Sequence, residues 1–282
     1  MIVERGGWRV RSLHLWLPLG AYTIFTLFPF YWMAVTSIKP NSELYNRKIM
    51  PLIVYHPTLQ HYIDLLTETN FLLWTWNTFL VATISTIVSL VFGTMLAYPL
   101  ARMRFAGSAL ISFGVAATYL VPQPLLFIPL ADIISSLGMN DTLTSVMLTY
   151  PTLLIPFCAW LLMGYFRSVP VELEDAARID GATRLQTMFK VFLPLCTPGF
   201  ISAGIFAFTL AQNEFLYALI FLTQTDVRTV PVGAIAELVK GDVFYWGQLM
   251  AAALLGSVPV AIIYSFFVEH YVAGLTAGAV KQ

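Results

Sequence analysis

Charged residues are scarce in this chain of 282 residues. Asp, Glu, Lys and Arg make up 11% of it, against about 25% in an average soluble domain. The formal net charge is zero, which argues against a nucleic-acid partner. Cysteine is also rare, and both cysteines, Cys158 and Cys196, fall inside or at the edge of apolar stretches. We therefore expect buried thiols instead of a disulfide or a metal site.

The sequence also lacks the motifs of an ATP-hydrolysing enzyme and of a metal site. A phosphate-binding loop needs Gly-Lys followed by Ser or Thr, and none of the five lysines follows a glycine. The four histidines, at positions 14, 56, 61 and 270, have no metal-ligand spacing. We expect no catalytic residue, no metal and no cofactor in this chain. Energy for any transport must then come from a gradient or from a partner protein.

Long apolar stretches are what the sequence has in abundance. Hydrophobic residues make up 58% of it, and the mean hydropathy is +0.76. Six stretches reach the roughly 20 apolar residues that cross a bilayer. They cover residues 13–37, 71–100, 109–131, 143–165, 195–223 and 247–271. This pattern predicts an all-α membrane protein with six transmembrane helices, whose membrane domain is 13–271. The first stretch is expected to be a retained anchor, because it is longer than a signal-peptide core.

The positive charges predict the orientation of these helices. With the N-terminus inside, ten Lys and Arg residues fall on the inner side and five on the outer side. We therefore expect a cytoplasmic N-terminal segment, 1–12, and a cytoplasmic tail, 272–282. The polar insert between the fourth and fifth spans, residues 166–194, is then cytoplasmic too.

The first half of this insert has the pattern of a short helix. Ser168 suits the N-cap position, and Pro170 suits the first turn. Glu172, Glu174 and Asp175 lie near the positive end of the helix dipole. Gly181 supplies the stop, since glycine readily adopts the left-handed conformation that ends many helices.

A second short helix is predicted after the glycine. Thr183 and Gln186 have the spacing of a capping box. Apolar residues then recur at the i, i+3, i+4 and i+7 spacing of one helix face, ending at Pro194. They are Leu185, Met188, Phe189 and Phe192. In the first helix, Ala176 and Ala177 are small enough to let a partner surface approach closely, so the insert has the character of a docking element.

The insert also resembles a known family. Asp175-Ala176-Ala177, three residues, Gly181, nine residues and then residues 191–194 (Val-Phe-Leu-Pro) are similar to the E-A-A-x₃-G-x₉-I-x-L-P loop in membrane subunits of bacterial ATP-binding-cassette (ABC) importers. Residues 177–182, 213–215 and the end of the chain, 274–281, resemble the carbohydrate branch, in particular the smaller maltose-type permease. The resemblance covers nearly the whole chain. It implies a type I ABC importer permease fold in the bacterial inner membrane.

The resemblance implies partners and a coupling role for the insert. In the family this loop sits in a groove of an ATP-binding subunit and transmits its closure to the spans. Carried over, the coupling residues are Glu174, Asp175, Ala176, Ala177, Asp180, Gly181 and Pro194. Asp175 stands where the family usually has Glu, one methylene longer. The implied partners are a second homologous permease, two ATP-binding cassette subunits, an extracytoplasmic solute-binding protein, a sugar-like substrate and membrane lipid.

A polar group in the fifth span is the candidate substrate path. A carboxylate facing lipid would cost at least about 2.5–3.5 kcal/mol, so Glu214 should face protein or a watery cavity. Sugars are neutral and need amides, carboxylates and aromatic faces. Such groups are present at Gln212, Asn213, Glu214 and Tyr217. Alternatively, Glu214 makes an interhelical hydrogen bond that fixes the pair of permeases. Gln212 departs from the Trp common in the family.

The expected function is therefore that of a permease subunit, which is not an enzyme, in an ATP-driven, binding-protein-dependent carbohydrate importer. A permease of the same kind for a glycerol-phosphate or polyol solute is an alternative. The rival from another class is a gradient-driven carrier with Glu214 as an ion site. A carrier has no need of the docking loop, and a structural membrane scaffold would explain neither that loop nor Glu214. Residues 224–246 lie where maltose-type permeases send a loop towards the binding protein, so the resemblance implies the same role for this segment.

Overall fold

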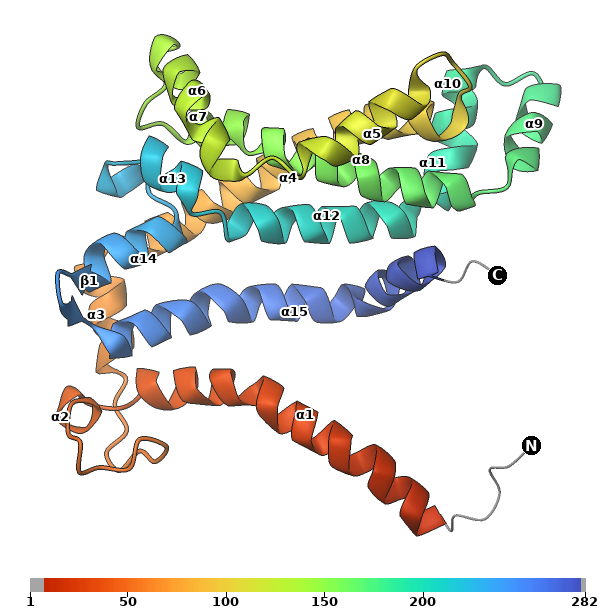
Figure 1. Ribbon diagram of the computed structural model, residues 1–282. Coiled ribbons are helices and arrows are strands. Elements are labelled where there is room, and N and C mark those ends of the chain that lie inside the picture. The colour runs from red at the N-terminus through yellow and green to blue at the C-terminus, as the bar shows by residue number, and fades with distance from the viewer. Residues whose placement is uncertain (1–7, 280–282) are drawn as a thin grey trace. The chain divides into compact units, whose positions relative to one another are not determined.

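The computed structural model describes residues 8–279 (Figure 1). The chain divides into two compact units, one made of residues up to 69 with 236–258, the other of 70–235 with the residues from 259 onward. The predicted segments 1–12 and 272–282 lie partly outside the described residues. Where it is described, the first begins α1 at Trp8, and the second continues α15 through Ala279.

The fold is mostly helical. The longer helices are α1 (Trp8–Ser37), α4 (Phe71–Arg102), α5 (Ser108–Thr118), α6 (Gln123–Ser136), α8 (Pro151–Ser168), α12 (Thr197–Gln212) and α15 (Trp246–Ala279). The shorter ones are α2 (Asn41–Leu44), α3 (Gln60–Glu68), α7 (Leu143–Thr149), α9 (Val171–Ile179), α10 (Arg184–Thr187), α11 (Leu193–Leu195), α13 (Leu216–Phe221) and α14 (Val230–Leu238). A π-helix, η1 (Met188–Phe192), and a 3₁₀ turn, η2 (Thr225–Val227), join some of them. Strands β1 (Val239–Lys240) and β2 (Val243–Phe244) form an antiparallel hairpin.

The six predicted spans correspond to four long apolar segments and two bent helix pairs. Residues 15–37, 71–102, 143–168 and 246–267 are each long and apolar enough to cross a membrane. Counting each bent pair as one span brings the total to six. These four segments agree with the spans predicted at 13–37, 71–100, 143–165 and 247–271.

The third span, predicted as one helix at 109–131, is broken. Helices α5 and α6 meet at an angle of 94°. Pro122 precedes α6, and Pro124 lies in its first turn. Proline disfavours helical backbone in the residue before it and removes a helical hydrogen bond, so the chain turns here.

The fifth span, predicted at 195–223, is also not one helix. Helix α12 ends at Gln212, and α13 begins only at Leu216. Before α12, the segment Arg184–Leu195 meets it at 75°. Of the three intervening residues, Asn213 and Glu214 belong to the predicted substrate path.

In the unit formed by residues up to 69 with 236–258, a loop after α1 is held by buried polar groups. The Lys39 ammonium donates to the carbonyls of Met50 and Pro51, at 3.1 and 2.8 Å. The Glu43 carboxylate accepts from the backbone N–H groups of Tyr55 and His56. Burial raises the pKa of Glu43, but these bonds and the His56 ring outweigh it and hold the pKa below its ordinary value. Hydrogen bonds from buried side chains therefore hold this loop in a defined conformation.

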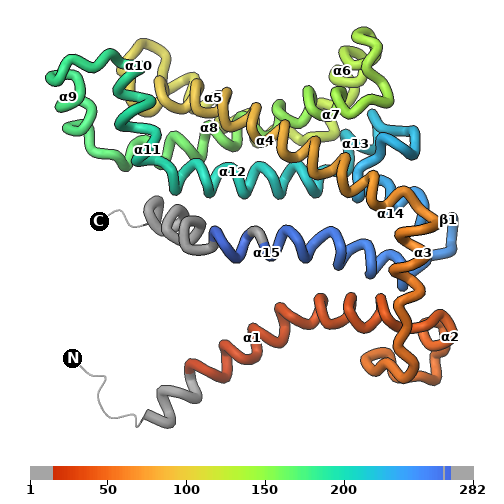
Figure 2. Tube along the Cα trace, turned by 180° about the vertical axis from the view of Figure 1, so that it is seen from behind, coloured from red at the N-terminus to blue at the C-terminus, as the bar shows by residue number. Residues whose placement is uncertain are grey.

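In the other unit, α4, α8 and α12 lie side by side and form the core, as the views from both sides show (Figures 1 and 2). A Cβ added to Gly93 of α4 would lie 2.8 Å from the Cys158 Cβ of α8, so the absence of a side chain lets the two helices approach closely. Both cysteines are free and buried, which confirms the prediction for them. The insert, α9 to α11, lies at one end of these helices, and α6, α7 and α13 lie at the other (Figure 1).

Candidate functional site

The turn at Gly181 is built as the sequence predicts. Gly181 has φ +88°, and its N–H donates to the Arg178 carbonyl while that of Ala182 donates to the Ala177 carbonyl. This pair of bonds is a Schellman motif, which satisfies the last carbonyls of α9. Space is not the constraint at Gly181, since a Cβ there would meet nothing within 4 Å. The backbone conformation alone favours glycine.

The helix starts in the insert were predicted with mixed success. The capping box is confirmed, because Thr183 Oγ1 accepts from Gln186 N and Gln186 Oε1 accepts from Thr183 N. The N-cap assigned to Ser168 is wrong. Its hydroxyl donates back to the Tyr165 carbonyl at 2.7 Å, so Ser168 ends α8, and Pro170 is the N-cap of α9.

The apolar stripe predicted at 185–192 does not form one face. Residues Met188–Phe192 form the π-helix η1, which widens the turn and shifts the register. Phe192 is fully buried and Met188 packs against the same core cluster, whereas Leu185 and Phe189 are 67% and 60% exposed. The insert therefore presents apolar side chains outward.

Two of the three acidic residues of α9, Glu174 and Asp175, have different surroundings. Glu174 turns inward, and its Oε1 accepts from Arg102 Nε at 2.5 Å. Asp175 turns away, with a side chain 61% exposed and 3.9 Å from Arg178. Successive residues of a helix differ by about 100° in direction, which explains the split. Asp175 is thus open to a partner, while Glu174 is engaged within the chain.

The other predicted coupling residues lie mainly on the surface. Ala176, Asp180, Gly181 and Pro194 are exposed, and Ala177 is half-buried. Exposed apolar side chains accompany them at Val171, Leu173, Ile179, Leu185 and Phe189. Helix α9 has no buried side chain of its own. Exposed apolar groups around a short helix indicate a surface that another protein covers.

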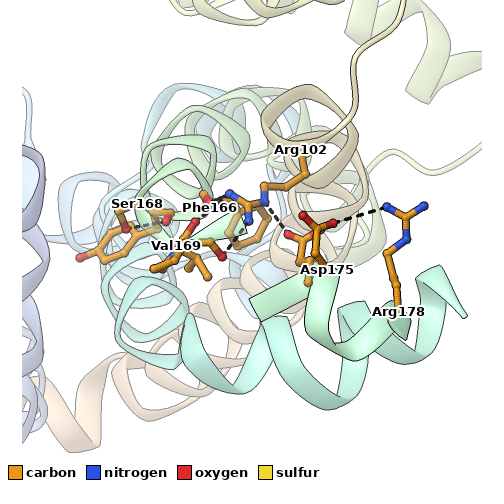
Figure 3. A network of polar contacts seen from close by, with 9 residues as sticks. Arg102, Phe166, Ser168, Val169, Asp175 and Arg178 are labelled. Carbon is orange, nitrogen blue, oxygen red and sulfur yellow. Dashed lines mark hydrogen bonds and ion pairs between the residues drawn. The ribbon is translucent and has the colours of Figure 1, made fainter. Parts of the chain in front are cut away.

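Arg102 was missed by reasoning from the sequence, which counted it only as an inner positive charge. Its Nη1 donates to the carbonyls of Val169 and Phe166, at 2.8 and 3.2 Å, and its guanidinium lies 5.1 Å from the centre of the Phe192 ring (Figure 3). A local sequence pattern cannot reveal this contact, because Arg102 and Glu174 are 72 positions apart.

A cavity of about 850 Å³ lies where the two broken spans meet. It is lined by Thr118, Tyr119, Leu120, Val121, Pro122, Gln123, Leu126, Tyr150, Thr152, Leu153, Leu154, Pro156, Thr209, Leu210, Ala211, Asn213, Glu214, Phe215 and Leu216. The cavity size suits a small solute, and amide, hydroxyl and aromatic groups interrupt a mostly apolar wall. The sequence did not single out Tyr119, Gln123 or Thr152, because nothing local marks a bend as a cavity wall.

Glu214 lines this cavity and also caps a helix. Its Oε1 accepts from Tyr217 N at 2.9 Å and its Oε2 from Ala218 N at 3.1 Å, and both N–H groups lie in the first turn of α13. The residue is only 8% exposed. This local role differs from both the sugar contact and the subunit contact that the sequence suggested. The carboxylate keeps lone pairs for a further donor.

The structure separates the remaining residues of the predicted substrate path. Asn213 lines the cavity and donates from Nδ2 to the Thr209 carbonyl at 2.9 Å. Gln212 is half-buried at the end of α12, outside the cavity lining. Tyr217 is fully buried in the core cluster that includes Tyr150. Two of the four predicted residues, Asn213 and Glu214, therefore share one cavity.

At the far end of α4 from the insert, polar side chains hold the segment that follows α13. Asp141, in the left-handed conformation at φ 55°, accepts from Thr223 N and Gln224 N, at 2.6 and 3.1 Å. Burial raises the pKa of Asp141, but these bonds and one from the Thr223 hydroxyl outweigh it and hold the pKa below its usual range. On α4, Asn77 donates to the carbonyls of Asp226 and Arg228.

Long apolar helices, a cavity at the broken spans and an exposed short helix at the opposite end are features of a membrane permease subunit. The chain belongs to the family described as binding-protein-dependent transport system inner membrane component, which matches residues 89–276. It is a multi-pass inner-membrane transport subunit of an ABC importer and not an enzyme, since ATP hydrolysis belongs to the partner subunits. This membership favours the main expectation over the gradient-driven carrier.

Relatives match almost the whole chain. The sulfoquinovosyl glycerol transport system permease protein SmoH of Agrobacterium fabrum is 40% identical over 90% of this chain and 89% of its own length. The trehalose/maltose transport system permease protein MalG of Thermococcus litoralis is 35% identical, covering 94% and 96%. The diacetylchitobiose uptake system permease protein DasC of Streptomyces coelicolor is 32% identical, covering 96% and 99%.

Solved structures share the fold. A chain of a bacterial ABC transporter involved in import of the acidic polysaccharide alginate matches with a TM-score of 0.75 at 20% identity, over 93% of this chain and 97% of that one. A chain of the MetNI methionine ABC transporter matches with a TM-score of 0.59 at 18% identity, over 76% and 97%. The predicted type I ABC importer permease fold is confirmed.

Proposed function

We propose that this chain forms half of the translocation pore of an ATP-driven importer for a carbohydrate. The other half is a second homologous permease, and two ATP-binding subunits and an extracytoplasmic solute-binding protein complete the machine. The carbohydrate class is supported by the relatives, whose names include sulfoquinovosyl glycerol, trehalose/maltose and diacetylchitobiose. Glycerol-phosphate and polyol solutes remain the alternative within the same kind of transporter.

The observation that carries the proposal is the exposed face of the insert. Asp175, Ala176 and Asp180 lie on the surface beside apolar side chains such as Ile179, which is 86% exposed. An apolar face ringed by charge fits the groove of a folded partner better than it fits water. We assign this partner as the ATP-binding subunit, with the insert and both chain termini on the cytoplasmic side, where the excess of Lys and Arg also places them.

The cavity is the proposed solute path through this half of the pore. Gln123, Asn213 and Glu214 offer amide and carboxylate groups, and Tyr119 and Phe215 offer aromatic faces. Sugars present hydroxyls and apolar ring faces, so this mixture suits them. The broken helices at 118–122 and 213–215 leave backbone polar groups beside a cavity, where a membrane protein can keep them hydrated.

Docking is tested by reversing the exposed charge. Asp175→Lys places a like charge against any basic group of the ATP-binding subunit, so we expect loss of its co-purification and of solute uptake, with the permease still in the membrane. Asp175→Asn should lose less, because it keeps an acceptor. The matched control is Glu68→Lys, an exposed acid at the end of α3. Normal co-purification and uptake with Asp175→Lys would exclude this docking surface.

Energy coupling is tested with the complete transporter in vesicles. Uptake of a radiolabelled disaccharide should require internal ATP and should survive collapse of the proton gradient by a protonophore. A panel of labelled disaccharides, polyols and glycerol phosphate, supplied with the cognate binding protein, distinguishes the solute classes. Uptake that stops on adding protonophore at constant ATP would instead identify a gradient-driven carrier.

A further inference from the structure

Arg102, the last residue of α4, has a buried side chain that contacts the insert both before and after the Gly181 turn. The side chain is 6% exposed. It bonds the end of α8 through the carbonyls of Phe166 and Val169, and α9 through Glu174. Its cation also lies over the ring of Phe192, beyond the Gly181 turn. One guanidinium thus joins the chain before the docking helix, the docking helix itself and the chain after it (Figure 3).

Helix α9 also packs against α10 and η1, which follow it in the insert, and Glu174 interacts with Tyr98 of α4 as well as with Arg102. No α9 side chain is buried, and a short extended segment, Val169 and Pro170, connects α9 to α8. Among the described side chains, those of residues 15–262 and 264–267, the ion pair between Arg102 and Glu174 joins α9 to a membrane-spanning helix. Arg102 donates in a planar fork to several acceptors at once, a geometry that Lys cannot reproduce.

Helix α4 carries this contact to the opposite end of the unit. It is one continuous helix of 32 residues, with Pro99 in its last turn. Near its start, Trp74 Nε1 donates to the Thr225 carbonyl at 2.8 Å, and Asn77 donates to the Asp226 carbonyl at 2.9 Å. A helix rises by about 1.5 Å per residue, so Asn77 and Arg102 are roughly 40 Å apart. The same continuous helix is hydrogen-bonded to the docking helix at one end and to the segment after α13 at the other.

We propose that Arg102 is the positioning residue through which displacement of α9 becomes displacement of α4, and so of residues 225–228. The inference rests on the proposed function, since it takes α9 as the docking helix of the ATP-binding subunit. Without the Arg102 bonds, the segment at Val169 and Pro170 would act as a hinge and absorb the motion. A continuous helix held at both ends is a physical route for coupling between two sites. Coupling is reciprocal, so binding protein at the far end should reach the ATP-binding subunits through Arg102.

The test uses the complete transporter in proteoliposomes, with purified binding protein and sugar. The readout is the ratio of stimulated to basal ATP hydrolysis, together with co-purification of the ATP-binding subunit. We expect Arg102→Lys and Glu174→Gln to lower that ratio at least about fivefold while the subunits still co-purify. The matched control Arg104→Gln removes an exposed arginine two positions away and should leave the ratio unchanged. Asn77→Leu, at the other end of α4, should lower the ratio in the same direction.

The outcomes separate this inference from the docking proposal. If Asp175→Lys abolishes co-purification while Arg102→Lys and Glu174→Gln keep the parent's stimulation ratio, docking stands and the positioning role of Arg102 is overturned. If both Arg102→Lys and Glu174→Gln fail to accumulate in the membrane, the contact serves folding, which also overturns it. If Asp175→Lys leaves co-purification intact, the docking proposal fails, and the positioning role that rests on it fails with it.

Discussion

Gly93 of α4 faces Cys158 of α8 at a distance that leaves no room for a side chain. A Cβ on Gly93 would lie 2.8 Å from the Cys158 Cβ and 3.2 Å from the Ala159 backbone nitrogen. The second of these neighbours is main chain, which cannot rotate away. The separation of the two central helices therefore depends on glycine at this position.

Gly93→Ala should lower the thermal unfolding midpoint of the purified permease, since overpacking costs about 1–3 kcal/mol. The control is Gly164→Ala in α8, where an added Cβ would meet nothing within 4 Å. Replacing that helical glycine should be neutral or stabilising by up to about 1 kcal/mol. The measurement is thermal unfolding in detergent, followed by intrinsic fluorescence. Equal midpoints for the two variants would contradict the packing argument.

Gly181→Val should impair coupling through backbone strain. A β-branched residue at φ +88° costs about 1–3 kcal/mol, so the Schellman turn opens and α10 leaves its position relative to α9. We expect uptake and co-purification of the ATP-binding subunit to fall together. Gly181→Asn, which tolerates the left-handed conformation, should keep most of both. Parent-level activity in the valine variant would show that the turn is not needed.

Glu214 variants should separate the capping role from a solute contact. Gln keeps one acceptor oxygen for α13, and Leu keeps none, so the unfolding midpoint should fall in the order parent, Gln, Leu, with a loss of about 1–3 kcal/mol for Leu. Uptake kinetics on the same preparations complete the test. If both variants unfold like the parent while the KM for sugar rises, Glu214 acts on the solute and not as a cap.

Asp141 should make the segment after α13 sensitive to acid. Its folded-state pKa is lowered, so its contribution to stability is present above the unfolded pKa, about 3.9, and is lost as pH falls through the folded value. Asp141→Asn keeps a residue suited to positive φ but loses the charge. Parent and Asn variant should therefore differ in unfolding midpoint at pH 7 and converge as pH falls below about 4. A constant difference across this range would refute the role of the charge.

Local rules predicted the parts of the insert whose cause lies within a few residues. The capping box needs only Thr183 and Gln186, and the left-handed turn needs only Gly181, so both were predictable. Ser168 was misassigned because a serine between two helices can serve either, and its hydroxyl bonds the Tyr165 carbonyl of the earlier one. The apolar stripe failed because the π-helix η1 changes the 3.6-residue period on which such a pattern depends.

Contacts between distant segments and breaks within apolar runs were harder to predict. Composition alone makes residues 109–131 one apolar stretch, although the prolines at 122 and 124 turn the backbone within it. Asn213 and Glu214 were recognised as polar residues within a span. The sequence did not predict that α12 ends at Gln212, just before them. The bond from Arg102 to Glu174 depends on how α4 and α8 lie together, which no local period encodes.

The burial of both native thiols has a practical consequence. Cys158 and Cys196 are 0% and 2% exposed, so a water-soluble maleimide finds no accessible sulfur on the folded chain. A single cysteine placed at Ile179, the most exposed apolar position of the insert, would then be the one labelled site without prior removal of the natural pair. A fluorophore or spin probe attached there would report, in real time, each encounter of this permease with the subunit that drives it.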